Sequence, residues 1–365
     1  MAFGDYTKYE VAAVTTDETG HYNLRQVVVD TLGRIYVVHR DDGVACSYSD
    51  DGGTTWTQVI LDSTAYTPSV CLDEDGHTLH IVYCDLSISG GQVKYITGDV
   101  AAGWSIPVAV GAAGSAHPSI HVAGNNIVYI TYYQGSNWTV RNIAGGLWSV
   151  AAAFGTYHGY TSWSTITSIN DGGYYTPYIF WNYGENVGAQ KVYYTYWHPI
   201  LGVWVAPIEL HSALWTIYGM SAAVDSHDTI HFAHHDLAGG TNYIRYRYKL
   251  LGEAWSGVGT VNSSSSSRWP SVSVDGGDCV CIAWDTSYYN YIRQTLDNGN
   301  TWSSVLRLST TGNSGYPSLM ENTPTGKTYM SVNVMYAQDN TGPQMYWDID
   351  TLSPISAVGN YAYFM

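Results

Sequence analysis

The sequence has few positive charges and no long apolar run, and each shortage excludes a class of protein. Lysine and arginine number 14 against 30 acidic residues, which gives a formal net charge of −16. A chain this acidic is poorly suited to contacting phosphates, so nucleic acid is not an expected partner. No run of 18 apolar residues is present, so we do not expect insertion into a membrane.

Cysteine is also scarce: the five copies are Cys46, Cys71, Cys84, Cys279 and Cys281. Their number is odd and their spacing does not suit a metal site. The last two lie two residues apart on one expected strand and cannot bridge easily. We therefore interpret all five as buried free thiols in a protein that folds in a reducing compartment. The N-terminus has neither the basic nor the apolar region of a secretory signal, so we expect synthesis in the cytoplasm without export.

Aromatic residues and glycine are abundant. The chain has 33 Tyr, 14 Trp and 38 Gly, and only 12% of its residues are charged. Aromatic and β-branched residues favour strands, whereas Gly, Ser and Asp favour turns. No stretch has the pattern of a long helix, so the chain is expected to be all-β.

A repeat runs through the sequence, and its clearest marker is tryptophan. Tryptophans that open a similar strand recur at intervals of 44 to 56 residues: Trp56, Trp104, Trp148, Trp204, Trp255 and Trp302. Aligned with them are seven apolar inner strands, near residues 24–30, 68–73, 118–122, 163–171, 220–225, 270–275 and 317–320. Repeats of this length are typical of propellers.

The repeats predict a single domain, a seven-bladed β-propeller of four-stranded antiparallel blades. The seventh repeat lacks its Trp-led fourth strand, and a strand at 10–14 stands ahead of the first repeat. We infer that this N-terminal strand closes the ring. Residues 1–15 would then be the closing strand and 16–350 the blades. Residues 351–365 would be a C-terminal tail, either a second closing strand or a place where a partner or another copy binds.

A second motif, S/T-x-D-x-G-x-T-W, occurs twice. Its specified positions are Ser49, Asp51, Gly53, Thr55 and Trp56, and again Thr295, Asp297, Gly299, Thr301 and Trp302. The physical interpretation is a tight hairpin turn: the Asp and Ser/Thr side chains accept hydrogen bonds from the turn backbone, and the Gly takes a positive φ. The Trp then starts the next strand.

This motif resembles the Asp-box, or BNR repeat, of sialidase-type β-propellers. The resemblance implies that each turn joins the third and fourth strands of a blade, on the face away from the active site. Sialidases of this family have six blades, so a count of seven argues against a straightforward sialidase. We treat the two motif turns as structural.

The opposite face would carry the site, because it holds the loops between second and third strands and between successive blades. The polar and aromatic residues expected there are His21, Tyr22, His39, Arg40, Tyr66, Asp85, His117, His158, Trp163, Trp215, Tyr218, Trp269 and Asp285. Aromatic rings stack on sugars, while His, Arg and Asp hydrogen-bond hydroxyl or carboxylate groups. We therefore expect a ligand groove on this face.

Two hydrolytic chemistries find little support. A sialidase needs an arginine cluster, and Arg25 falls where that family has Arg-Ile-Pro, yet Gln26 and Val27 follow it here. No Tyr/Glu nucleophile pair is evident. An ordinary glycosidase needs two carboxylates about 5 to 10 Å apart, and Asp85, Asp236 and Asp285 occupy matching loop positions without one pair standing out.

A polysaccharide lyase is the stronger enzymatic alternative. Residues 230–236 followed by 242–246 resemble one blade of propeller lyases that act on ulvan. A lyase needs a cation to neutralise a uronate carboxylate and a His or Tyr as base. The candidate catalytic residues are His234, His235, Asp236, Arg25, Arg268 and Tyr316.

The favoured interpretation is a propeller without turnover that binds a glycan or cell-surface receptor, or serves a structural role. Its composition and missing signal are similar to those of phage virion components such as tail fibres, receptor-binding proteins and decoration proteins. Other virion proteins would then be partners, and the virion surface its final location. No cofactor and no metal are expected. The alternative is a carbohydrate-active enzyme, with a lyase ahead of a glycosidase or sialidase.

Overall fold

The computed structural model describes residues 8–13, 25–40, 43–135, 137–144, 147–156, 163–184, 190–212, 217, 219–286, 289–307, 314–320, 332–338 and 342–348. These segments contain strands and turns and no helix, as the sequence predicts. Within them, accordingly, nothing helical could cross a bilayer. The predicted C-terminal tail, 351–365, lies outside the described residues.

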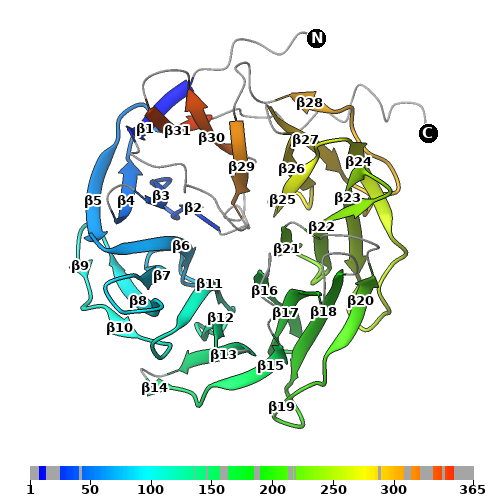
Figure 1. The fold of residues 1–365 in the computed structure, drawn as a ribbon, viewed down its shortest axis with the longest axis horizontal. Helices are drawn as coiled ribbons and strands as arrows, with labels where there is room; N and C mark the ends of the chain where they lie inside the picture. The colour runs from blue at the N-terminus through cyan, green and yellow to red at the C-terminus, as the bar shows by residue number, and fades with distance from the viewer. Residues whose placement is uncertain are drawn as a thin grey trace.

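The described strands form seven antiparallel sheets (Figure 1). The first has β2 (Val27–Val29), β3 (Ile35–Arg40), β4 (Val44–Ser49) and β5 (Thr57–Asp62). The second has β6 (Ala65–Leu72), β7 (Leu79–Asp85), β8 (Gln92–Asp99), β9 (Gly103–Trp104) and β10 (Val108–Ala109). The third has β11 (Ser115–Val122), β12 (Val128–Gln134), β13 (Asn137–Ala144), β14 (Leu147–Trp148) and β15 (Ala152–Thr156).

The fourth sheet has β16 (Ser164–Asp171), β17 (Tyr174–Gly184), β18 (Gln190–His198), β19 (Val203–Trp204) and β20 (Ile208–Ser212). The fifth has β21 (Met220–Val224), β22 (Ile230–Ala238), β23 (Thr241–Lys249) and β24 (Gly259–Ser264). The sixth has β25 (Arg268–Val274), β26 (Val280–Asp285), β27 (Asn290–Thr295) and β28 (Leu306–Arg307). The seventh has β29 (Ser314–Leu319), β30 (Val332–Gln338), β31 (Gly342–Asp348) and β1 (Lys8–Ala13).

The seventh sheet joins the two ends of the chain. Strand β1 pairs antiparallel with β31, with Tyr9 opposite Trp347. Strand β1 is thus the fourth strand of this sheet, at Lys8–Ala13, where the sequence predicts a strand at residues 10–14. Each of the seven predicted inner strands is the first strand of a sheet, and Figure 1 shows these strands nearest the centre.

Serine side chains link the inner strands of neighbouring sheets. The Ser221 hydroxyl accepts a hydrogen bond from the Val272 amide at 3.1 Å, and the Ser271 hydroxyl accepts one from Leu319 at 2.9 Å. The Ser318 hydroxyl accepts one from the Gln26 amide at 3.2 Å. This last bond places the seventh sheet directly beside the first, although the two residues are 292 positions apart.

The core lies between the sheets. Alternate residues of each strand face opposite neighbours, so five hydrophobic clusters of described residues each join two adjacent sheets. The repeat tryptophans cover these seams: Trp255 packs on the cluster of the fourth and fifth sheets, and Trp302 on that of the fifth and sixth. Trp302 lies edge-on to Tyr246 with ring centroids 5.3 Å apart.

The two motif turns have the geometry that their residues predict. In the first, the Asp51 carboxylate accepts hydrogen bonds from the Thr55 amide (2.8 Å) and hydroxyl (2.7 Å), and the Ser49 hydroxyl accepts one from Gly53 (2.8 Å). The second turn repeats these bonds with Asp297, Thr301, Thr295 and Gly299. Both turns join the third and fourth strands of their sheets.

Antiparallel pairing sorts the connections into two faces. Turns between first and second strands and turns between third and fourth strands lie at the same end of the sheets, here called the turn face. The remaining connections, and the start of each inner strand, lie at the opposite face. All five cysteines are free: Cys46, Cys71, Cys84 and Cys281 are buried and Cys279 is half-buried.

Candidate functional site

The structure describes only part of the predicted site. His21, Tyr22, His158, Trp215 and Tyr218 lie outside the described residues. For Tyr316 only its position in β29 is described. The remaining candidates can be placed, and they fall into four groups: strained residues at the start of inner strands, an aromatic pair, side chains already engaged in the fold, and residues of β22.

Three inner strands contain a residue with a left-handed backbone at the same position. Thr67, His117 and Trp269 have φ angles of 51°, 53° and 54°, and each is followed by Pro and Ser. The strand pairing shifts by a bulge at each of these positions. A left-handed non-glycine residue costs about 1–3 kcal/mol, so the surrounding sheet must hold it there. Because this backbone strain recurs at the start of three inner strands, next to the opposite face, we take that face as the candidate site.

Trp163 and Trp269 meet on this face although their sheets are not neighbours. Trp163 directly precedes β16 in the fourth sheet, and Trp269 lies in β25 in the sixth. Their ring centroids are 5.0 Å apart and their planes 70° apart, an edge-to-face contact. Trp163 is buried, whereas Trp269 is half-buried. The pair is a rigid aromatic surface of the kind on which an apolar sugar face stacks.

A buried amide network supports this pair. The Asn182 side-chain oxygen accepts a hydrogen bond from the Trp163 amide at 2.8 Å, and its nitrogen donates to the Ile217 carbonyl at 3.3 Å. The Gln190 side-chain oxygen accepts from the Ile217 amide at 2.7 Å. Sequence reasoning missed Gln190, because nothing in its neighbourhood distinguishes a buried amide from a surface one.

Several predicted ligand residues are engaged within the fold. Asp85 is buried, and its carboxylate binds the Lys94 ammonium (2.5 Å), the Thr64 hydroxyl (2.9 Å) and the Ser87 amide (2.8 Å). Burial alone would raise the pKa of Asp85, but these bonds lower it well below its ordinary value. His39 is fully buried, with its Nε2 2.8 Å from the Ser47 hydroxyl. Both contribute to the fold at these positions.

The remaining described candidates lie at strand ends on the opposite face. Arg268 is exposed at the start of β25, directly across the strand pair from the buried Asp285. Tyr66 is half-buried in β6, and Arg40 is half-buried at the end of β3. Desolvation lowers the pKa of His117 to about 4, so this imidazole is neutral at pH 7.

The His234-His235-Asp236 run lies inside strand β22 and not in a loop, which corrects the sequence-based placement. The strand continues to Ala238 before its turn, and all three side chains are buried. Adjacent strand residues point to opposite faces of a sheet. His234 therefore lies on the side of the fourth sheet, like Phe232, while His235 lies on the side of the sixth, like Ala233. The two imidazoles cannot act together on one substrate atom.

Arg25 spans the centre of the molecule. Its guanidinium donates a hydrogen bond to the Ala222 carbonyl at 2.8 Å and lies 3.4 Å from the His121 Nδ1. It lines one end of a cavity of about 340 Å³ whose other walls include Asp73, Glu74 and Gly124, near the turn face. Arg25 is thus buried, and the lining of this cavity does not include Trp269.

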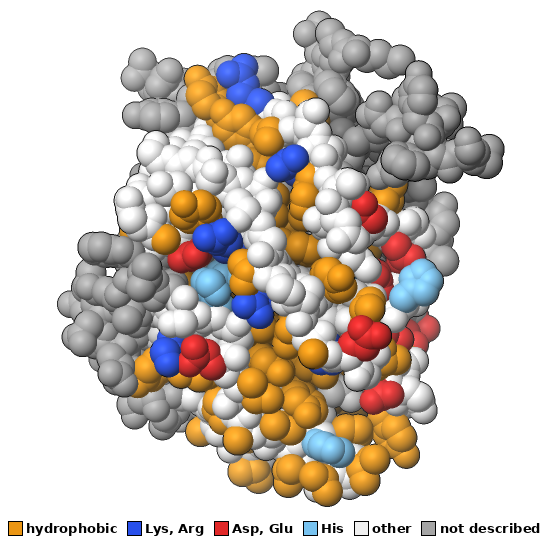
Figure 2. Space-filling model, turned by 90° about the vertical axis from the view of Figure 1, so that its right-hand side faces the viewer, with side chains coloured by type: hydrophobic (Ala, Val, Ile, Leu, Met, Phe, Trp, Pro, Cys, Tyr) orange, Lys and Arg blue, Asp and Glu red, His pale blue; other side chains and the backbone are white. Residues whose placement is uncertain are grey.

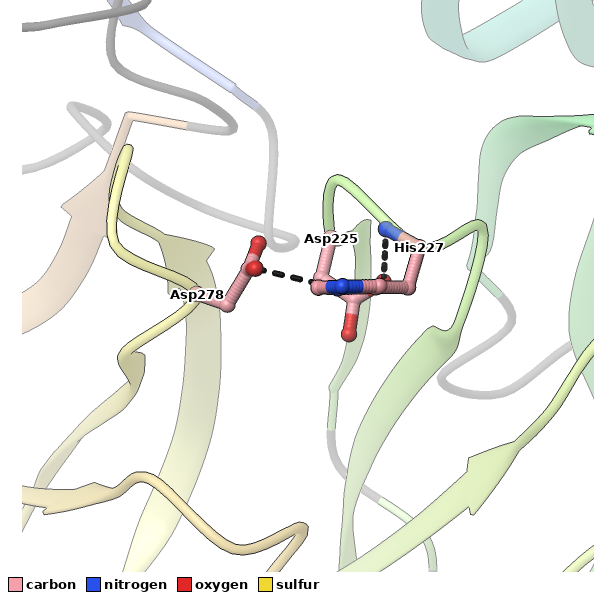
Figure 3. A group of neighbouring side chains, drawn as sticks. All are labelled: Asp225, His227 and Asp278. Carbon is pink, nitrogen blue, oxygen red and sulfur yellow. Dashed lines mark hydrogen bonds and ion pairs between the residues drawn. The ribbon is translucent and has the colours of Figure 1, made fainter.

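One group of metal-ligand type residues occurs in the described part of the chain: Asp225, His227 and Asp278, on the turn face (Figure 3). The Asp278 carboxylate lies 3.1 Å from the His227 Nδ1 and accepts hydrogen bonds from the Ser226 amide and hydroxyl, both at 2.8 Å. Asp225 accepts bonds from its own turn and lies 3.1 Å from the buried His231. Each carboxylate is therefore already satisfied.

Related links recur between other sheets. The Asn126 side chain accepts a hydrogen bond from the Glu74 amide at 2.8 Å, and Asp228 accepts one from Asn170 at 2.6 Å. Asn126, Asp228 and Asp278 each have a positive φ in the turn between first and second strands. The Asp278 contact thus belongs to a series of side chains that connect successive turns, and we interpret the group in Figure 3 as structural.

No protein-family model and no curated protein matches the chain. Solved structures do. A polysaccharide lyase of family PL25, an ulvan lyase, is 14% identical with a TM-score of 0.66, over 93% of this chain and 95% of that one. The fucoside-bound lectin of Aleuria aurantia is 13% identical with a TM-score of 0.54, over 80% of this chain and 97% of that one. The polysaccharide lyase Uly1 is 12% identical with a TM-score of 0.55, over 95% and 93%.

At these identities the likeness shows the fold alone. The chain has the β-propeller type of fold, and its structural neighbours include both carbohydrate-binding and carbohydrate-cleaving proteins.

Proposed function

We propose that this chain is a non-catalytic β-propeller that binds a glycan at the opposite face, around Trp163 and Trp269. The observation that carries the proposal is their edge-to-face contact at 5.0 Å, formed between two non-adjacent sheets and partly exposed. A rigid aromatic surface of this kind matches the apolar face of a sugar ring. The strained residues at the same level, His117 among them, would supply polar contacts around it.

The proposed architecture is a single domain of seven Asp-box-type blades. It is supported by the seven sheets, by the pairing of β1 with β31, and by the Gln26–Ser318 hydrogen bond between the last sheet and the first. The motif turns support the Asp-box assignment through their repeated Asp-to-Thr hydrogen bonds.

A polysaccharide lyase is the second candidate, because the two lyase structures described above match more than nine-tenths of this chain in fold. The candidate bases argue for binding instead. His234 and His235 are both fully buried and lie on opposite faces of β22. A general base must reach the proton that it abstracts.

We further propose a place in a virus particle, where the chain would bind a cell-surface receptor alone or together with other virion proteins. The support is compositional: a chain with 14 Lys and Arg residues against 30 acidic ones, in which all five cysteines are free. Purified particles probed with an antibody to this chain would test that placement, and its absence from them would contradict it.

The test of binding is a glycan array, followed by a turnover assay on whatever binds. Trp269→Ala should weaken affinity at least tenfold, about 1.4 kcal/mol. The matched control is Trp204→Ala, which removes another half-buried Trp with an edge-to-face partner, Trp197 at 5.7 Å, far from this face. Equal affinities in the two variants would contradict the proposed site, and an unsaturated product would assign the chain to the lyases.

A further inference from the structure

A polar cluster lies at the seam between the fourth and fifth sheets. It comprises His211 of β20, His234 and Asp236 of β22, and Arg245 and Arg247 of β23, and is called the seam cluster below. His234 pairs across the strands with Arg245, and Phe232 with Arg247, so these side chains share the face toward the fourth sheet. The His211 and His234 rings are 4.6 Å apart.

The cluster contains buried polar atoms without partners in the described part of the chain, although its His211, Arg245 and Arg247 residues are only half-buried. Among the described residues, neither ring nitrogen of the fully buried His234 has a hydrogen-bond partner, and the same holds for Asp236 Oδ1 and Arg247 Nε. Other atoms of the cluster are engaged: Asp236 Oδ2 lies 3.2 Å from Arg245 Nε and 3.4 Å from His211 Nε2, and Arg245 also donates to the Thr260 hydroxyl at 2.5 Å. Buried polar groups in proteins are normally paired, so several open groups in one place indicate a missing partner.

The charge of the cluster identifies the kind of partner. The cluster holds two guanidinium groups and a single carboxylate, Asp236, which pairs with Arg245, so an excess positive charge remains even with both histidines neutral. The nearby Glu209 of β20 does not compensate, because it pairs with Lys191 at 2.6 Å. Burial and the neighbouring cations hold the pKa of His234 well below its ordinary value. A metal cation would be repelled here, whereas an anion would be attracted.

We infer that the seam cluster binds an oxyanion, a carboxylate or a sulfate group, between Arg247 and His234. Guanidinium groups bind such oxygens through paired N–H donors, and the protonated nitrogen of a neutral imidazole supplies another donor. Figure 2 shows the side of the molecule that carries β20 and β23, where Lys/Arg, His and Asp/Glu side chains gather on a largely uncharged surface. The inference goes beyond the proposed function, because the seam cluster would bind the oxyanion group itself, whether that group belongs to a free anion or to an acidic sugar.

The test is isothermal titration of the purified chain with sodium sulfate, sodium glucuronate and sodium acetate, at constant ionic strength set with chloride. We expect saturable binding of at least one oxyanion and a loss of at least tenfold in affinity in Arg247→Gln. The control is Arg307→Gln, which removes an exposed arginine that stacks on Tyr289 at 4.8 Å and should leave affinity unchanged.

Tighter binding of glucuronate than of acetate would indicate the acidic group of a sugar, whereas preference for sulfate would indicate a sulfo group or the free ion. If Arg247→Gln does not fold, the ring-nitrogen NMR shifts of His234 in the wild-type protein replace it, and they should move with the titration. Absence of saturable binding, equal binding in both variants, or unmoved His234 signals would overturn the inference. None of these results depends on what binds at Trp269.

Discussion

The motif turns allow a quantitative prediction for Asp297→Ala. Three hydrogen bonds converge on this carboxylate: from the Thr301 amide at 2.8 Å, the Thr301 hydroxyl at 2.7 Å and the Thr295 hydroxyl at 2.8 Å. Each bond contributes about 0.5–1.5 kcal/mol, and partial exposure favours the low end, so the variant should lose about 2 kcal/mol. With about 2.1 cal/mol/K of unfolding entropy per residue over 365 residues, the midpoint should fall by about 2–3 °C.

The assay is thermal and urea denaturation, with glycan affinity measured in parallel. These bonds lower the pKa of Asp297, against the opposing effect of burial, so the carboxylate stabilises the fold above its ordinary pKa of 3.8. The difference between wild type and variant should therefore shrink as the pH falls below 3.8. Asp50→Ala is the control, because its exposed ion pair with Arg34 should contribute less than about 1 kcal/mol. A weaker affinity at unchanged stability would refute the structural role.

Two further predictions concern stability. Burial lowers the pKa of His235 to about 4, so as the pH falls the unfolded chain binds this proton before the folded chain does. The free energy of unfolding should therefore decrease by up to about 3 kcal/mol between pH 6.5 and 4. A urea midpoint that falls as steeply in His235→Gln as in wild type would contradict this. Gly299→Ala should destabilise the fold far more than Gly240→Ala, although both glycines have φ near 82°. A Cβ added at Gly299 would lie 2.6 Å from the Tyr246 ring, whereas a Cβ added at Gly240 would have none of the described atoms within 4 Å. Equal melting temperatures would contradict that packing argument.

The parts of the fold that the sequence predicts are those specified by neighbours along the chain. A motif turn is determined within eight residues: Ser49 bonds Gly53, and Asp51 bonds Thr55, without help from another sheet. Two of the repeat tryptophans, Trp255 and Trp302, cover the seams beside their own strands. The N-terminal strand was predictable by counting, because the seventh repeat lacked its fourth strand and one strand preceded the first repeat.

The aromatic pair of the candidate site was only half predictable. Trp163 and Trp269 were each expected on the opposite face, but their contact depends on how two sheets flank a third. The same holds for Arg25, which the sequence places at the start of an inner strand and the structure places across the centre, against Ala222. The X-Pro-Ser pattern at Thr67, His117 and Trp269 was available as a signal, since its repetition at one level marks a shared bulge.

The histidines of β22 explain why adjacency in sequence was misleading. Three polar residues in a row suggested a loop, yet the turn begins only after Ala238, and strand geometry divides the row between two seams. His235 finds a partner there, the Asn242 side-chain oxygen at 2.7 Å, and becomes part of the core. His234 finds none among the described residues and lies beside two arginines. A common role for the two residues is therefore excluded by the sheet itself, and any function at this position belongs to the side that His234 shares with Arg245 and Arg247.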